Sequence, residues 1–140
     1  RPGICRLFPL GRYYEENGSF QYFLQIHECK KENRTKVKVK KWIDTPDLKQ
    51  YEAYISRWHY FLKDIRTAET EAAQKLLAEP CTGTAQEQEI QKKNRAAAAA
   101  GREKRRNLLI MKLFYLLPYD GKKDFYEQFE KRMQMAERSL

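Results

Sequence analysis

The chain of 140 residues is poor in the side chains that most often hold metals, with three cysteines and two histidines. An odd cysteine count without close pairing argues against a secreted disulfide framework, so Cys5, Cys29 and Cys81 are predicted to be free thiols in a reducing compartment. A zinc site could join Cys5 to His27 and Cys29, but it would lack a fourth ligand and the paired spacing of zinc sites. We therefore expect no metal and no other cofactor.

Catalytic motifs are also missing. The sequence has no phosphate-cradling glycine loop, no nucleophile elbow and no zinc-protease helix motif. His59 lies between Trp58 and Tyr60 and is interpreted as a structural side chain rather than a base. We expect a protein that is not an enzyme and has no small-molecule substrate.

Long hydrophobic runs are absent as well. The longest mainly apolar stretch, residues 108–117, has ten residues and contains Lys112. A helix needs about 20 apolar residues to cross a bilayer. No membrane span is expected. The stretch is apolar nearly all round, which predicts burial on several sides.

The charge of the chain is high and unevenly spread. There are 28 basic and 19 acidic residues, for a net charge of +9, which divides into +4 over residues 1–47, −2 over 48–90 and +7 over 91–140. A basic–acidic–basic layout predicts separate surfaces. A polyanionic partner, most often nucleic acid, is the favoured interpretation; a merely solubilising surface or an anionic lipid partner is the alternative.

Two stretches have the alternating pattern of strands with one buried face, residues 20–27 and 35–43. The polar connection between them is short, which predicts an antiparallel hairpin. Two strands are marginal in water, so a third strand from residues 4–14, or a covering helix, is needed. Asn17-Gly18 is a turn signal ahead of the first strand.

The rest of the chain has helical periodicity, with helices predicted over about 46–79, 85–117 and 122–138. Thr45 is predicted to cap the first helix, with Pro46 at its first position. An apolar seam with 3-4 spacing follows, interpreted as a protein contact or core: Leu48, Tyr51, Ile55, Trp58, Leu62 and Ile65.

The predicted fold class is α+β and mainly α, with an N-terminal β-hairpin or small sheet, a long helical hairpin and a C-terminal amphipathic helix. We expect an irregular arm plus basic hairpin over residues 1–44 and a helical region over 45–140, together forming one structural unit. Two helices of more than thirty residues would each span ~45–50 Å, longer than a compact domain of this mass, ~30 Å. The helical hairpin is therefore predicted to project or to lie along a partner.

Two basic clusters are the candidate RNA contacts. The first contains Lys30, Lys31, Arg34, Lys36, Lys38, Lys40 and Lys41. In the predicted strand, Lys36, Lys38 and Lys40 share a face with Trp42, which suits phosphate contact and base stacking. An edge strand protected from aggregation by its lysines is an equal alternative.

The second cluster lies on the predicted helix over residues 85–117 and contains Lys92, Lys93, Arg95, Arg102, Lys104, Arg105 and Arg106, with Glu103 as the only acid among them. These residues would surround most of the helix circumference. A solvated helix usually mixes charges of both signs, so RNA backbone binding is favoured here. The five alanines at 96–100 are interpreted as helix filler rather than as a surface for close approach.

No motif assigns the chain to a family. The favoured hypothesis is a structural subunit of a ribonucleoprotein in the mitochondrial matrix, with the mitochondrial ribosome as the preferred example and with rRNA and neighbouring proteins as partners. An accessory or scaffold subunit of a respiratory or transcription-type complex is the alternative. A secreted binding protein, glycosylated at the sequons of Asn17 and Asn33, is a third hypothesis.

Overall fold

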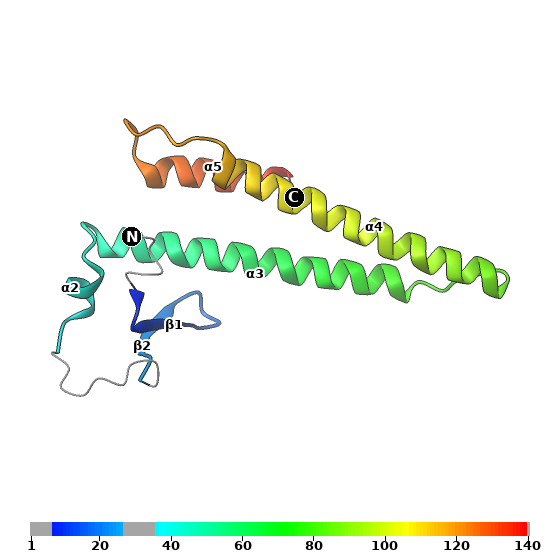
Figure 1. Cartoon of the computed structure of the whole chain (residues 1–140), viewed down its shortest axis with the longest axis horizontal. Helices are drawn as coiled ribbons and strands as arrows, with labels where there is room; N and C mark the ends of the chain where they lie inside the picture. The colour runs from blue at the N-terminus through cyan, green and yellow to red at the C-terminus, as the bar shows by residue number, and fades with distance from the viewer. Residues whose placement is uncertain (1–6, 27–35, 140) are drawn as a thin grey trace. The chain divides into compact units, whose positions relative to one another are not determined.

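The computed structural model describes residues 7–26 and 36–139. The chain forms two compact units, Arg1–Leu62 and Lys63–Leu140, so the boundary falls within one long helix. Along the chain (Figure 1) the elements are β1 (Leu10–Tyr14), β2 (Phe20–Leu24), α2 (Val39–Ile43), α3 (Leu48–Ala78), α4 (Ala85–Met111), the π-helix η1 (Lys112–Leu116) and α5 (Phe125–Ser139). This order confirms the predicted α+β, mainly α class.

Strands β1 and β2 form an antiparallel pair with Tyr14 opposite Phe20 and Leu10 opposite Leu24. The turn between them contains Gly18 at φ +88°, a left-handed conformation that glycine adopts without steric cost. Phe23 faces Gly11 across the strands, and a Cβ on Gly11 would lie 2.3 Å from the Phe23 ring. The pair therefore needs glycine at position 11, because the aromatic ring occupies the space of the missing side chain.

The predicted pairing of residues 20–27 with a strand over 35–43 is wrong. The partner of β2 is β1, which lies within the region considered for a third strand. Residues 39–43 form the short helix α2, whose first turn is closed by bonds from the Lys41 and Trp42 amides to the Lys38 carbonyl, at 2.9 and 3.0 Å. Val39 and buried Ile43 are four apart, so their spacing fits a helix as well as an alternating strand.

The hairpin of the first unit packs on the start of α3. The Tyr14 and His59 rings stack at 3.5 Å between centroids, nearly parallel. The Tyr60 hydroxyl donates to the Ser19 carbonyl at 3.0 Å, and the Arg12 guanidinium donates to the Tyr51 hydroxyl at 3.0 Å. These contacts supply the covering helix that a two-stranded sheet needs.

Helix α3 begins at Leu48, two residues later than predicted. The Asp47 carboxylate, not Thr45, caps the helix by accepting a hydrogen bond from the Gln50 amide at 3.0 Å. Pro46 consequently precedes the helix instead of occupying its first position. Aspartate serves as well as threonine at an N-cap and also complements the positive end of the helix dipole.

The second unit contains the helical hairpin turn, Glu79 to Thr84, and helices α4 and α5. Arg95 of α4 donates to the carbonyls of Glu79 and Pro80, and Gln91 donates to the Thr82 carbonyl at 3.0 Å. Side chains of α4 thus bind carbonyl groups of the hairpin turn that follows α3.

The core of the second unit lies between η1 and α5. Leu113, Phe114, Phe129 and Met133 are buried, and the Phe114 and Phe129 rings lie 5.5 Å apart. The prediction that the whole stretch 108–117 is buried on several sides is wrong, because five of its apolar side chains remain exposed: Leu108, Met111, Tyr115, Leu116 and Leu117.

Candidate nucleic-acid interface on helix α4

Helix α4 begins at a capping box. The Thr84 hydroxyl accepts a hydrogen bond from the Glu87 amide, and the Glu87 carboxylate accepts one from the Thr84 amide at 2.7 Å. These bonds lower the pKa of the Glu87 carboxyl, because the Thr84 amide and hydroxyl both stabilise its charged form. The cap fixes where the helix begins, and the basic residues follow from there along its length.

Two of the seven basic side chains of α4 are engaged within the unit. Arg106 forms an ion pair with Glu69 of α3, with only 15% of the arginine side chain and 26% of the glutamate side chain exposed. Arg95 pairs with Glu79 at 3.6 Å in addition to its bonds at the hairpin turn. Both residues therefore hold α3 and α4 together, and neither is available to an external phosphate.

The other five basic side chains of α4 are exposed: Lys92, Lys93, Arg102, Lys104 and Arg105. Lys93 makes a solvated pair with Glu89 at 3.7 Å. Within residues 7–26 and 36–139, Arg102, Lys104 and Arg105 take part in no ion pair. The cluster predicted around the helix is thus divided into an inner pair that stabilises the hairpin and an outer cationic group.

A hollow of about 800 Å³ lies beside this outer group, between the second half of α3 and the middle of α4. Alanines line much of it, at positions 68, 72, 73, 99 and 100, and Arg102 and Arg105 also contribute. Their small side chains leave the space open. Glu69 and Glu103 are the acidic members of the lining.

The first basic cluster does not form the predicted strand face. Lys36, Lys38, Lys40 and Lys41 are exposed, but the last two lie on helix α2, so the alternation that placed three lysines beside Trp42 is lost. The Trp42 indole donates to the Phe8 carbonyl at 3.2 Å and is only partly exposed. Lys30, Lys31 and Arg34 lie outside the described residues.

The apolar seam of α3 is only partly enclosed. All six of its members are half-buried: Leu48, Tyr51, Ile55, Trp58, Leu62 and Ile65. The fully buried side chain of this face is Phe61, whose ring lies 5.8 Å from that of Trp58. The predicted seam therefore lies beside Phe61, the buried residue of this helix.

Sequence reasoning missed the role of Arg132 on α5. Its guanidinium is buried and donates to the carbonyls of Leu113, Leu117 and Pro118 at 2.7, 2.8 and 2.8 Å. It also lies over the Tyr119 ring, 3.6 Å from the centroid. The available signal was an arginine set among the apolar residues of an amphipathic helix.

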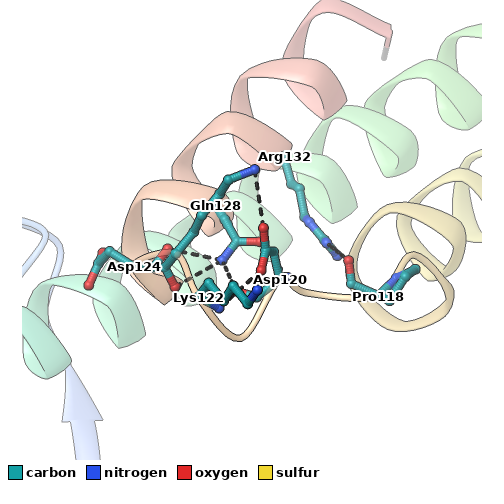
Figure 2. A network of polar contacts seen from close by, with 7 residues as sticks. Pro118, Asp120, Lys122, Asp124, Gln128 and Arg132 are labelled. Atoms are coloured by element: carbon teal, nitrogen blue, oxygen red, sulfur yellow. Dashed lines mark hydrogen bonds and ion pairs between the residues drawn. The ribbon is translucent and has the colours of Figure 1, made fainter.

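A second group of bonds extends this arrangement (Figure 2). The Gln128 side chain accepts from the Asp120 amide at 2.8 Å and donates to the carbonyls of Asp120, Lys123 and Asp124 at 3.0 to 3.2 Å. Both Gln128 and Arg132 satisfy backbone groups of the η1–α5 connection. We interpret the network as structural, because its donors and acceptors are saturated by the chain itself.

The described residues offer little for catalysis. The ring of His59 is stacked on Tyr14, and no three histidine, cysteine or acidic side chains converge within the part of the chain that is described. Cys81 is a free thiol, as predicted. His27, Cys5 and Cys29, the members of the conceivable zinc site, lie outside the described residues.

Among residues 7–26 and 36–139, no helix is both long enough and apolar enough to span a bilayer.

Comparison with known proteins found no matching family model, no matching curated protein and no matching solved structure.

Proposed function

We propose that the chain is a non-catalytic structural subunit of a large ribonucleoprotein and binds RNA backbone through the outer face of α4. The mitochondrial ribosome is the assembly to test first, with rRNA and adjacent ribosomal proteins as partners and the mitochondrial matrix as the location. The alternative of an accessory subunit in a purely protein complex is an outcome of the tests below.

The observation that carries the proposal is the unbalanced charge on the exposed side of α4. From residue 90 to 111 the helix has seven basic residues and one acidic residue, and only two of the seven, Arg95 and Arg106, are engaged across the hairpin. Solvated helices gain stability from pairs of opposite charge at i,i+4. Among the exposed basic residues of α4, Lys93 makes such a pair with Glu89, whereas Arg102, Lys104 and Arg105 have no ion-pair partner within the described residues. These three unpaired cations form a surface suited to a polyanion.

Phosphate binding explains the spacing and type of these side chains. Residues 92 to 105 extend over about 20 Å at 1.5 Å per residue, long enough to follow several phosphates of one strand. Arginine offers a planar fork of donors to phosphate, and lysine a compact charge. The alanine-lined hollow beside Arg102 and Arg105 gives a backbone room to approach.

The proposal is tested by reversing three exposed charges together, in the variant R102E/K104E/R105E. Arg106 is left intact, since its pair with Glu69 supports the hairpin. Binding to unrelated RNA sequences should weaken uniformly, because phosphate contacts position a protein without reading sequence. The slope of log affinity against log salt should flatten by roughly two to three units for three lost contacts.

A matched control separates local contact from overall charge. The variant K49E/K75E/K131E changes the net charge equally at three exposed lysines outside α4, and it should retain most of the salt slope. Circular dichroism should show helicity unchanged in both variants. Equal losses in the two variants, or no loss in either, would remove α4 as an RNA-binding surface and favour the protein-complex alternative.

The assembly itself is tested by sedimentation of mitochondrial lysates. The endogenous chain should co-sediment with one ribosomal subunit and should shift to light fractions after ribonuclease treatment. Sedimentation that is insensitive to ribonuclease, or absence from the mitochondrial fraction, would contradict this assignment.

A further inference from the structure

The end of α4 and the π-helix η1 expose an apolar surface that the RNA-binding proposal does not use. Leu108, Met111 and Tyr115 follow a 3-4 spacing on one side of the helix, and Leu116 adjoins them. Their exposed fractions are 48%, 43%, 71% and 65%. These four residues are called the α4 apolar face below. Single exposed apolar residues are ordinary, but a contiguous group marks an interaction site.

The π-helix η1 carries two members of this surface. In η1 the Leu117 amide bonds to the Lys112 carbonyl, five residues back, at 2.9 Å. Leu113 and Phe114 are buried in the core, whereas Tyr115 and Leu116 are exposed.

This geometry is held by buried contacts. Arg132 binds the carbonyls of Leu113 and Leu117 on either side of the turn. Short π-helical insertions are rare and occur frequently at functional sites. Exposure of Tyr115 and Leu116 is therefore a fixed property of the second unit rather than the fraying of a helix end.

A hollow of about 340 Å³ adjoins the α4 apolar face. Its lining consists of Ala100, Glu103, Lys104, Asn107, Leu108 and Met111. All of these residues lie on one face of α4, so the hollow is an open groove above the small Ala100, between the larger side chains of a single helix. An apolar side chain of a partner can contact this groove.

The charges around the face identify the partner's chemistry. Lys104 lines the hollow and Lys112 follows Met111 in the chain, and both are exposed. Two more exposed basic residues, Arg102 and Arg105, precede Leu108 on α4. Glu103 is the only acidic residue between positions 90 and 119. A second copy of this chain would place like charges together, at a cost in free energy, whereas a partner with acidic residues beside its apolar stripe would complement them.

We propose that the α4 apolar face docks an amphipathic helix of a neighbouring protein, with an apolar side chain in the hollow and carboxylates toward Lys104 and Lys112. This is the helix-in-groove mode, in which apolar anchors at i, i+3, i+4 and i+7 contact the receiving surface. Lys104 is shared with the RNA-binding proposal, but the apolar anchors Leu108 and Met111 are not, so substitutions at these two positions test the docking proposal separately.

The first test uses two synthetic helical peptides with the same leucine stripe, one flanked by glutamates and the other by lysines. The intact chain should bind the acidic peptide at least ~tenfold more tightly in fluorescence anisotropy, and Leu108→Asp or Met111→Gln should weaken that binding by ~tenfold or more. Ile90→Asp is the matched control, since Ile90 is also an exposed apolar residue of α4 outside the face.

Several results would overturn the proposal. These are equal affinity for the two peptides, failure to bind either, or binding that survives both Leu108→Asp and Met111→Gln. Self-association of the wild-type chain that Leu108→Asp abolishes would assign the face to a second copy. The RNA salt slope of the Leu108→Asp variant should be unchanged, which keeps failure of this proposal distinct from failure of RNA binding.

The second test places a photo-reactive residue at Met111 or at Tyr115 in the native cells, with exposed Glu71 of α3 as the control position. The expected product is a crosslink to another protein, within a segment that has helical apolar periodicity and flanking Asp or Glu residues. A crosslink to RNA, to lipid, to a second copy or to residues 7–62 of the same chain would contradict the proposal, as would a yield no higher than at Glu71.

Discussion

The guanidinium of Arg132 lies 3.6 Å from the ring centroid of Tyr119 and, at the same time, donates to three carbonyl groups of the η1–α5 connection. The side chain is buried and, within the part of the chain that the structure describes, has no carboxylate partner. Carbonyl dipoles and an aromatic face replace the water that its charge has lost. Burial also raises the pKa of the Tyr119 phenol.

Replacing Arg132 should therefore destabilise the second unit severely. Arg132→Met should cost about 2–4 kcal/mol in urea denaturation, because one buried and two partly buried hydrogen bonds from a charged donor to backbone carbonyls are lost. Arg132→Lys should recover only part, since an ammonium lacks the planar fork. Arg138→Met, at an exposed arginine of the same helix, is the control and should change stability by less than about half a kcal/mol.

The Arg106–Glu69 pair should couple α3 to α4 measurably. Both side chains are mostly shielded, so a double-mutant cycle with Arg106→Gln and Glu69→Gln should give a coupling near 1 kcal/mol. The exposed pair Lys93–Glu89, treated identically, should give at most about half that value. Equal couplings for the two pairs would show that burial at Arg106 contributes nothing.

The capping box of α4 predicts a loss of stability in acid. Because the folded-state pKa of Glu87 is lowered, its contribution is present above the unfolded pKa and is lost as pH falls through the folded value. Glu87→Gln should flatten the dependence of the melting temperature on pH in that acidic window. Thr84→Ala, which removes the reciprocal cap, should cost ~1 kcal/mol at neutral pH.

Tyr22 predicts a second dependence, in alkali. Burial raises the pKa of its phenol to about 12, so the folded state retains a proton that the unfolded state loses near pH 10. Stability should consequently fall as pH rises from about 10 to about 12. The difference between the ultraviolet titration curves of the wild type and of Tyr22→Phe should show one phenol that ionises near pH 12. Ionisation of that phenol near pH 10 would contradict the assignment.

Local signals predicted much of this protein. Helix α4 begins at Ala85, where the periodicity predicted a helix, and Asn17-Gly18 lies in the turn of a hairpin. Caps and turns depend on hydrogen bonds and dihedral angles within a few residues, so they survive whatever the distant chain does. The mainly helical class follows from periodicity over long stretches, which is likewise local.

The sequence predicted which basic residues belong to the candidate site, but not which of them are engaged within the protein and which face solvent. The sequence identifies seven basic residues on α4 as equivalent. Glu69 and the carbonyls at the hairpin turn withdraw Arg106 and Arg95 from that group, and both partners lie many residues away. Which cations face outward is therefore a property of how α3 and α4 pair, and periodicity on one helix does not contain it.

Tertiary structure alone decided three further features: the pairing of β2 with β1, the helical state of residues 39–43, and the exposure of half the stretch 108–117. The pattern of an alternating or apolar segment shows that one of its faces is to be buried, but it does not show which other segment will cover that face. Contacts between distant parts of the chain decide which segment buries that face. In the second unit, for example, Arg132 of α5 binds the Leu113 and Leu117 carbonyls and holds η1 in a π-helical turn. Leu113 and Phe114 are buried and Tyr115 and Leu116 remain exposed, because the core of the second unit, which includes Phe129 and Met133 of α5, covers only one side of η1.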